Sequence, residues 1–155
     1  MKILLLTNSI VGNEFYLRLK KNLNVEIYID ILRNKDLKKY DLVISYAYKY
    51  IIKKEKLLSC KRPPINLHIS LLPLNKGSDP NFWAWYNNTD HGVTIHHINN
   101  EIDGGDIIYQ KKINFKENES LLKSYQILNQ KIQELFFLNL DNIINYNYET
   151  HPQKG

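Results

Sequence analysis

Three polar residues in this sequence have side chains that could together carry out acyl transfer. Asn66 and His68 alternate with apolar neighbours, so period-two spacing puts both on one face of a predicted strand. Asp103 precedes two glycines, which would let the backbone approach a ligand closely. An amide donor, a titratable imidazole and a carboxylate can polarise a carbonyl group, stabilise its oxyanion and move a proton.

The other histidines and the single thiol give weaker signals. His96 projects from a later predicted strand, and we expect it at the edge of the pocket, shaping it without transferring protons. His91, His96 and His97 could suggest a metal site, but adjacent strand residues point apart and the only thiol is Cys60, so we expect no metal. No neighbour of Cys60 is arranged to lower its pKa, which argues against a cysteine nucleophile.

Alternating apolar patterns predict an α/β domain that would position these groups. A ligand crevice in such a sheet lies at the carboxyl ends of its strands, where the polar groups fall. Asp79 and Pro80 are typical of a helix start. Strands are predicted at 2–7, 25–31, 41–46, 65–70, 92–98 and 107–113, and helices at 13–23, 53–58, 80–87 and 120–144.

Length and charge narrow the class of protein. A chain of 155 residues predicts one domain, over residues 1–145, with a frayed tail at 146–155. The net charge of +5 comes from dispersed lysines with few arginines, which does not favour a nucleic-acid partner. The sequence has neither a signal peptide nor an apolar run of the roughly 20 residues that span a membrane, so we expect a cytoplasmic protein without a membrane partner.

Three segments taken together resemble the folate-dependent formyltransferase family. NLHISLLP at 66–73, followed by Lys76 and Gly77, resembles the family signature, and GVTIH at 92–96 with EIDGG at 101–105 resembles the second motif. SYAYKYI at 45–51 resembles the segment that lines the pterin pocket. The resemblance implies a Rossmann-like formyltransferase domain, with a twisted, mostly parallel sheet flanked by helices and a long C-terminal helix.

The resemblance also implies a reaction and assigns residues to it. The co-substrate would be 10-formyltetrahydrofolate, without a metal. Asn66 and a protonated His68 would stabilise the tetrahedral intermediate, and Asp103 would assist proton transfer. The residues implied to bind the cofactor are Tyr46, Ala47, Tyr48, Tyr50, Ile51, His96, Ile102, Gly104, Gly105 and Asp106. Those implied to bind the substrate are Ser70, Leu72, Lys76, Gly77 and Asn81.

Departures from the larger members favour the short nucleotide-sugar N-formyltransferases. Residues 7–13 do not resemble the glycine-rich phosphate loop of glycinamide ribonucleotide enzymes, and we expect no tRNA-binding domain of the kind that methionyl-tRNA enzymes carry. We therefore expect the acceptor to be the amine of a nucleotide-linked amino sugar made for a surface polysaccharide, and a homodimer fits so short a domain.

Other functions remain open from the sequence. Within the family, the chain could formylate another amine, as the glycinamide ribonucleotide and methionyl-tRNA enzymes do, or hydrolyse formyltetrahydrofolate. Outside it, the chain could be a non-catalytic folate-binding or nucleic-acid-binding domain. A nucleic-acid-binding domain would use an aromatic cluster to stack on bases, and the candidates are Phe82, Trp83 and Trp85. We interpret this cluster instead as part of the hydrophobic core.

Overall fold

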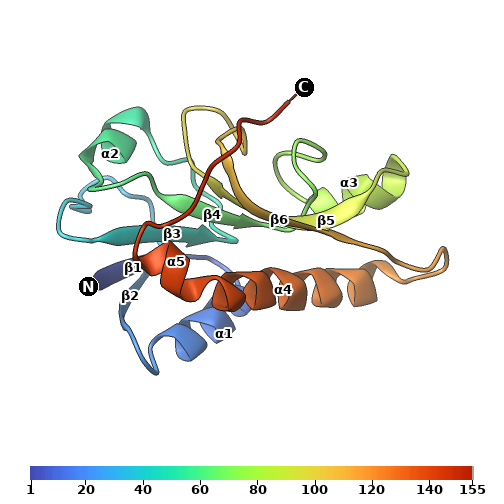
Figure 1. Cartoon of the computed structure of the whole chain (residues 1–155), viewed down its shortest axis with the longest axis horizontal. Coiled ribbons are helices and arrows are strands. Elements are labelled where there is room, and N and C mark those ends of the chain that lie inside the picture. The colour runs from blue at the N-terminus through green and yellow to red at the C-terminus, as the bar shows by residue number, and fades with distance from the viewer. Residues whose placement is uncertain (155) are drawn as a thin grey trace.

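The computed structural model describes residues 1–154 and arranges its strands in one six-stranded sheet, in the order β2-β1-β3-β4-β5-β6 (Figure 1). Neighbouring strands run parallel from β2 through β4, and β5 and β6 complete the sheet with antiparallel pairings. The predicted mostly parallel sheet is confirmed. The strands are β1 Lys2–Leu6, β2 Asn24–Tyr28, β3 Leu42–Tyr46, β4 Ile65–His68, β5 His91–His97 and β6 Ile107–Ile113.

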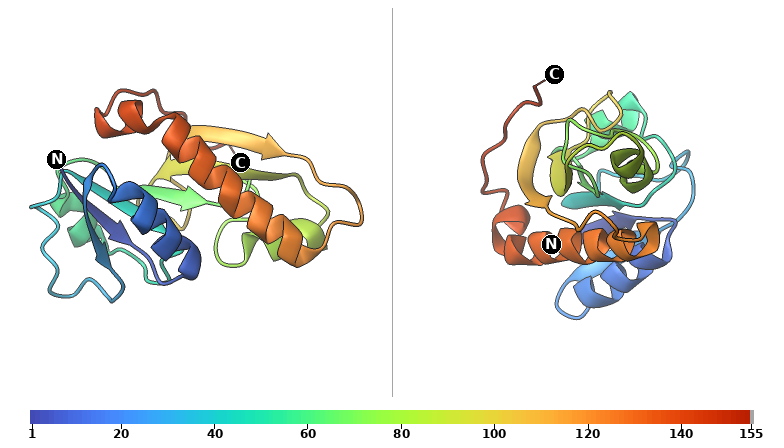
Figure 2. Two further views of the ribbon diagram at one scale, coloured as in Figure 1. Left: turned by 90° about the horizontal axis from the view of Figure 1, so that it is seen from below. Right: turned by 90° about the vertical axis from the view of Figure 1, so that its right-hand side faces the viewer.

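Helices flank this sheet, as expected. The helices are α1 Ile10–Leu19, α2 Lys54–Ser59, α3 Pro80–Tyr86, α4 Leu121–Leu138 and α5 Leu140–Ile144. Helices α1, α4 and α5 cover one face of the sheet, and α4 packs on β5, β6 and α3 (Figure 2). None of the helices described within residues 1–154 has both the length and the apolar character needed to cross a membrane.

Strand β1 shows why the sheet must be covered on both faces. Ile3 and Leu5 point into a core with Phe15 of α1 and Phe136 of α4. Leu4 and Leu6 point into a second cluster formed with the loops that follow β2 and β3. A continuous apolar run buried on both faces is typical of a central parallel strand.

The long C-terminal helix is confirmed, but it breaks earlier than predicted. Asn139 leaves the helical conformation (φ −108°, ψ 16°) and separates α4 from α5. Its side-chain amide donates to the carbonyl oxygen of Leu135 at 2.9 Å. Asparagine interrupts helices because its side chain competes for backbone hydrogen bonds. The prediction of a single helix over 120–144 is therefore wrong at this residue.

The prediction of a frayed tail from residue 146 is also wrong for the described residues. Tyr148 packs against the main core, and Ile107 and His151 exchange backbone hydrogen bonds of 2.8 and 2.9 Å. The tail thus pairs with the first residue of β6 at the edge of the sheet, and it is the dark red coil that leads to the C-terminus in Figure 1. A free sheet edge offers unpaired backbone groups, which explains why this polar segment becomes ordered.

The aromatic residues of α3 depart from the expected core position. Phe82 and Trp83 are each 44% exposed and contact one another edge to face. Only Trp85 behaves as expected: it packs on His91, and its indole N–H donates to the Ser124 hydroxyl at 3.0 Å. Helix α3 is therefore anchored through one aromatic side chain.

Candidate functional site

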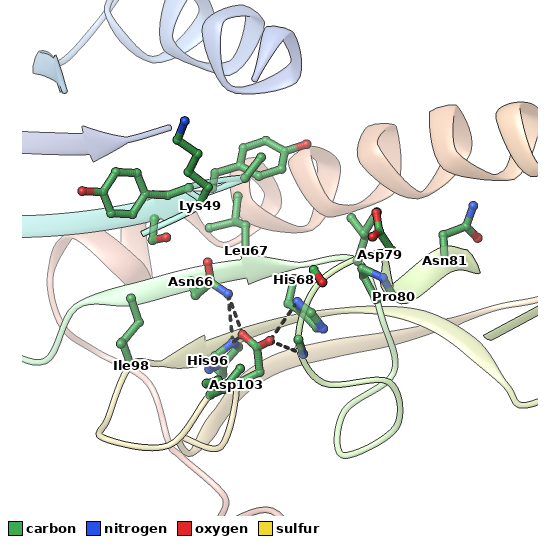
Figure 3. A pocket seen from close by; sticks show the side chains of 18 of the residues that line it. Lys49, Asn66, Leu67, His68, Asp79, Pro80, Asn81, His96, Ile98 and Asp103 are labelled. Carbon is green, nitrogen blue, oxygen red and sulfur yellow. Dashed lines mark hydrogen bonds and ion pairs between the residues drawn. The ribbon is translucent and has the colours of Figure 1, made fainter. Parts of the chain in front are cut away.

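The candidate site is a cavity of about 920 Å³ at the carboxyl ends of β3 and β4 (Figure 3). Asn66 and His68 share the face of β4 that lines it, while Leu67 between them is part of the core. In the sheet Asn66 is level with Ser45 of β3 and His96 of β5. The cavity lies in the usual place for a ligand in an open α/β sheet, and its volume suits a cofactor-sized molecule.

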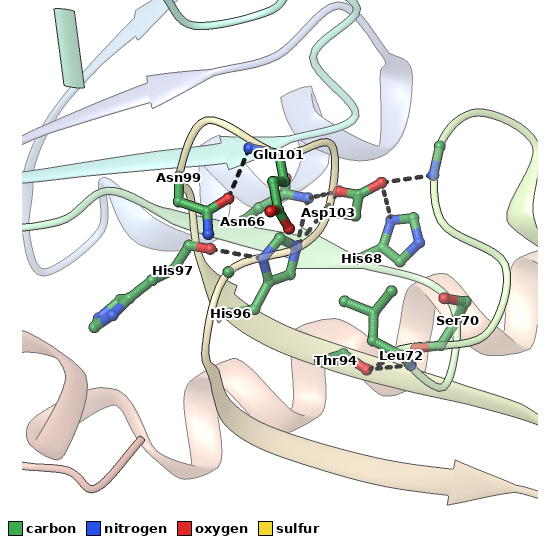
Figure 4. A network of polar contacts seen from close by, with 12 residues as sticks. Asn66, His68, Ser70, Leu72, Thr94, His96, His97, Asn99, Glu101 and Asp103 are labelled. Carbon is green, nitrogen blue, oxygen red and sulfur yellow. Dashed lines mark hydrogen bonds and ion pairs between the residues drawn. The ribbon is translucent and has the colours of Figure 1, made fainter. Parts of the chain in front are cut away.

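Asp103 reaches this strand from the loop between β5 and β6. Its Oδ1 accepts a hydrogen bond of 3.2 Å from the Asn66 amide, and its Oδ2 accepts one of 2.8 Å from the backbone N–H of Gly77. The same carboxylate lies 3.6 Å from Nδ1 of His68 and 3.5 Å from Nε2 of His96 (Figure 4). The side chains singled out in the sequence therefore meet around one carboxylate.

The surroundings of Asp103 keep it ionised. Burial alone would raise its pKa, but the adjacent side chain of His96, the nearby ring of His68 and the N–H of Gly77 outweigh burial and lower the pKa to about 2. The carboxylate is therefore a fixed negative charge near neutral pH, and only 14% of its side chain is exposed. A charge held this far from water acts strongly on neighbouring groups.

His68 lies between two hydrogen-bond acceptors. Its Nε2 is 3.0 Å from the carbonyl oxygen of Asn75, which can only accept, so Nε2 carries a hydrogen. Burial lowers the pKa of His68, opposed by the Asp103 carboxylate and the Asn75 carbonyl. This direction differs from the protonated ring implied by the sequence. In the neutral ring, Nδ1 and the Asp103 carboxylate face each other as two acceptors and can bind one proton between them.

His96 takes a more central place than the edge position expected from the sequence. It is 1% exposed, and its Nδ1 lies 2.8 Å from the carbonyl oxygen of His97, which fixes a hydrogen on that nitrogen. Its Nε2 lies 3.2 Å from the Asn66 amide nitrogen, which can only donate, so Nε2 accepts a hydrogen bond there. His96 therefore orients the Asn66 amide in addition to lining the cavity.

The residues implied to bind the cofactor divide into two groups. Those that line the cavity are Tyr46, Ala47, Tyr48, Tyr50, Ile51, His96 and Ile102. Gly104, Gly105 and Asp106 do not line it. A Cβ added to Gly105 would lie 1.7 Å from the backbone oxygen of His97. This glycine thus lets the loop pack against its own strand, not against a ligand as the sequence suggested.

The residues implied to bind the substrate divide in the same way. Gly77 and Asn81 line the cavity, whereas Ser70, Leu72 and Lys76 do not. Ser70 and Leu72 are held by Thr94, whose hydroxyl donates to the Ser70 carbonyl at 2.7 Å and accepts from the Leu72 N–H at 3.2 Å. The amide of Asn81 donates to Ser124 and to the Leu121 carbonyl, and so ties α3 to α4.

Sequence reasoning missed the contribution of α4 and of one lysine. Leu121, Leu122, Tyr125 and Asn129 form one wall of the cavity. The buried hydroxyl of Tyr46 donates to Asn129 at 2.6 Å. Within residues 1–154, Lys49 is the lysine that lines the cavity. The sequence signal that could have revealed this wall is Asn129 on the apolar face of the predicted helix, because a buried asparagine needs a hydrogen-bond partner.

The thiol and the histidines give no sign of other chemistry. Burial raises the pKa of Cys60 to about 11, which keeps the sulfur protonated near neutral pH. Over the part of the chain that the structure describes, histidine, cysteine and acidic side chains form no cluster of three or more suited to a metal ion.

Comparison with curated proteins gives two informative relatives. The bifunctional polymyxin resistance protein ArnA of Wigglesworthia glossinidia brevipalpis is 30% identical over 87% of this chain. The methionyl-tRNA formyltransferase of Ehrlichia ruminantium (strain Gardel) is 35% identical over 67% of this chain. The chain spans only 22% of the first relative and 36% of the second.

Solved structures and a family profile agree with these relatives. The formyltransferase PseJ from Anoxybacillus kamchatkensis was crystallised with UDP-4,6-dideoxy-4-formamido-L-AltNAc and tetrahydrofolate. It is 38% identical to this chain, with a TM-score of 0.89 over 99% of this chain and 82% of PseJ. The sequence profile described as Formyl transferase matches residues 20–139. The chain therefore belongs to the formyl transferase family.

Proposed function

We propose that this protein is an N-formyltransferase that moves a formyl group from 10-formyltetrahydrofolate to the amine of a nucleotide-linked amino sugar. The observation that carries the proposal is the convergence of Asn66 and His68 on the Asp103 carboxylate at the floor of the cavity. Family membership and the 38% identity to PseJ support the same reaction class.

The residues present fit a reduced folate. Exposed apolar side chains, Ile51 at 75% and Ile102 at 62%, line the cavity together with its polar groups, as suits a flat heteroaromatic ligand with polar edges. We assign the cofactor side of the cavity to a set of residues that excludes Lys49: Tyr46, Ala47, Tyr48, Tyr50, Ile51, Ile98 and Ile102. The formyl folate supplies an activated one-carbon acyl group, and the chain provides the donors and the proton acceptor beside it.

Asn66 is the donor that we assign to the formyl oxygen. Asp103 holds one hydrogen of its amide nitrogen, and the second points to Nε2 of His96. That second hydrogen can shift to an oxygen on which negative charge develops, while the Asp103 contact keeps the nitrogen in place. One such donor typically lowers the barrier by about 3 kcal/mol.

His68 and Asp103 are the groups that we assign to proton transfer. An attacking amine must lose a proton, which neutral Nδ1 of His68 with the Asp103 carboxylate can take between them. The same proton would pass to the leaving nitrogen of tetrahydrofolate as the bond between that nitrogen and the formyl carbon breaks. The Nε2–H of His68 stays hydrogen-bonded to the Asn75 carbonyl oxygen during this transfer and so holds the ring in position. This assignment requires a neutral His68 before the reaction, in keeping with the lowering of its pKa by burial.

Lys49 is the group that we assign to the anionic part of the acceptor. Its ammonium lies 5.1 Å from the centre of the Tyr50 ring, at the cavity wall. A diphosphate carries negative charge, which a lysine ammonium can bind as a point charge.

Assembly of the protein as a homodimer stays a prediction.

An acceptor screen tests the proposed function. The purified chain is incubated with 10-formyltetrahydrofolate and a panel of UDP- and dTDP-linked amino sugars, and the products are followed by mass. Gain of one formyl unit on a sugar supports the proposal. Formate release without an acceptor would instead indicate a hydrolase, and transfer only to glycinamide ribonucleotide or charged initiator tRNA would indicate another amine.

A further inference from the structure

The loop that carries Asp103 holds this residue in a restricted backbone conformation. Asp103 has φ 49°, in the left-handed region that side-chain-bearing residues seldom adopt. Inside the loop, the Glu101 N–H donates to the Asn99 side chain at 2.9 Å and the Gly104 N–H donates to the Glu101 carbonyl at 3.3 Å (Figure 4). These contacts leave the carbonyl groups of Asp103 and Gly105 to be bound from outside the loop.

Gln153 of the C-terminal tail binds both carbonyls. Its side-chain nitrogen donates to the Asp103 carbonyl oxygen at 2.7 Å and to the Gly105 carbonyl oxygen at 2.8 Å. A primary amide nitrogen has two hydrogens, and here each goes to one carbonyl of the same turn. The contact joins residues 50 apart in the sequence and reaches the backbone of Asp103, not its carboxylate.

The tail is fixed in register where it makes this contact. His151 and Ile107 exchange backbone hydrogen bonds, and the Tyr148 hydroxyl lies 3.0 Å from Nε2 of His97. Ile107 directly follows the Asp103 loop, so the tail is paired with the residue that ends the loop. Among the described residues, Oε1 of Gln153 is buried without a partner, so the two carbonyls are what orient this amide.

We propose that Gln153 is a positioning residue, which holds the Asp103 loop by its backbone carbonyls so that the carboxylate stays in contact with Asn66 and His68. The inference rests on the proposed function, because it gives Gln153 a part in the same site. Gln153 touches neither reacting group, so it acts only through Asp103.

Kinetics of Gln153→Met test the positioning role. Methionine keeps the length of the side chain and removes both donors. We expect kcat to fall about tenfold, since small displacements of a catalytic group are costly, while KM for the formyl donor changes little. Gln153→Asn, whose side chain is one methylene shorter but keeps its amide, is measured alongside it as the milder change. We expect its kcat to lie between those of wild type and Gln153→Met. His151→Ala is the matched control, because the bridge to Ile107 uses only backbone atoms.

An NMR titration of the histidine rings gives a readout that does not depend on turnover. The Asp103 carboxylate opposes the lowering of the His68 pKa by burial. Displacement of the loop in Gln153→Met should therefore lower the His68 pKa further, whereas His151→Ala should leave this pKa unchanged. An unchanged His68 titration in Gln153→Met would overturn the proposal, whether or not turnover falls. If the wild-type chain transfers no formyl group, the proposed function fails, and the titration still decides the role of Gln153.

Discussion

The Asn66 amide nitrogen and Asp103 Oδ1 lie 3.2 Å apart although 37 residues separate them in the chain. Asn66 lies in β4, whereas Asp103 lies in a loop, so this hydrogen bond joins the strand and the loop that together form the site. The bond also fixes which end of the Asn66 amide faces the carboxylate, because a carboxylate can only accept. Loss of either partner should therefore disturb both the donor and the proton acceptor.

Asp103→Asn should lower kcat about 100-fold, because the variant removes the charge that shares a proton with His68. The new amide would also direct hydrogens toward either the Asn66 amide or the Gly77 N–H, both of which are donors. Asp106→Asn, an exposed change outside the cavity, is the control. Single-turnover rates of formyl transfer measure the effect, and an Asp103→Asn rate within about threefold of wild type would refute the role given to this carboxylate.

Stability should fall as the pH drops below 6.5. Burial lowers the pKa of His68, His91 and His97 from the ordinary value of 6.5, so the unfolded chain binds protons there that the folded chain does not. The stability from these neutral rings is present above pH 6.5 and is lost as the pH falls through their folded pKa values. Thermal melts at pH 7.5 and at lower pH measure the loss. His68→Gln, which can still donate to the Asn75 carbonyl, should reduce the slope, and an identical slope in this variant would contradict the prediction.

Lys49→Ala should raise KM for the nucleotide sugar about tenfold with little change in kcat, a difference of about 1.4 kcal/mol in binding. The effect should shrink at high salt, because Lys49 is exposed and its charge is screened. Lys76→Ala is the matched control, since this exposed lysine does not line the cavity. Steady-state kinetics of both variants at two ionic strengths measure these changes in KM. A larger rise of KM in Lys76→Ala than in Lys49→Ala would contradict the assignment of Lys49 to the anionic part of the acceptor.

Tyr46→Phe should destabilise the fold by about 1–3 kcal/mol, because it leaves the buried Asn129 side chain without its donor. Tyr48→Phe is the comparison: its hydroxyl bonds to the Asp30 carbonyl at an exposed place, and we expect a change within about 0.5 kcal/mol. Urea unfolding of both variants measures the difference. Equal stability of Tyr46→Phe and wild type would show that the Tyr46–Asn129 contact contributes nothing.

The strands and the meeting of Asn66, His68 and Asp103 could be predicted from the sequence. Period-two alternation fixes which side chains share a face of a strand, and the carboxyl ends of parallel strands lie at one edge of the sheet. The resemblance to a known family then supplied the partnership of β4 with a distant loop, which periodicity alone cannot give.

The remaining features depend on contacts that are distant in sequence. Gly105 makes room for the backbone of His97, and no local pattern distinguishes that from room for a ligand. The tail looks frayed in isolation because it is polar, and it becomes ordered only on the edge of β6. The protonation of His68 could not be read from its partners, since burial outweighs the Asp103 charge in setting its pKa.

The most direct test of the central claim is the rate of formyl transfer by purified His68→Ala and Asn66→Ala, compared with wild type on the acceptor found by the screen. Circular dichroism first establishes that both variants are folded. The account predicts that each variant loses about 100-fold or more in turnover, as expected for loss of a proton acceptor or an oxyanion donor. Near-normal turnover by folded His68→Ala would contradict it.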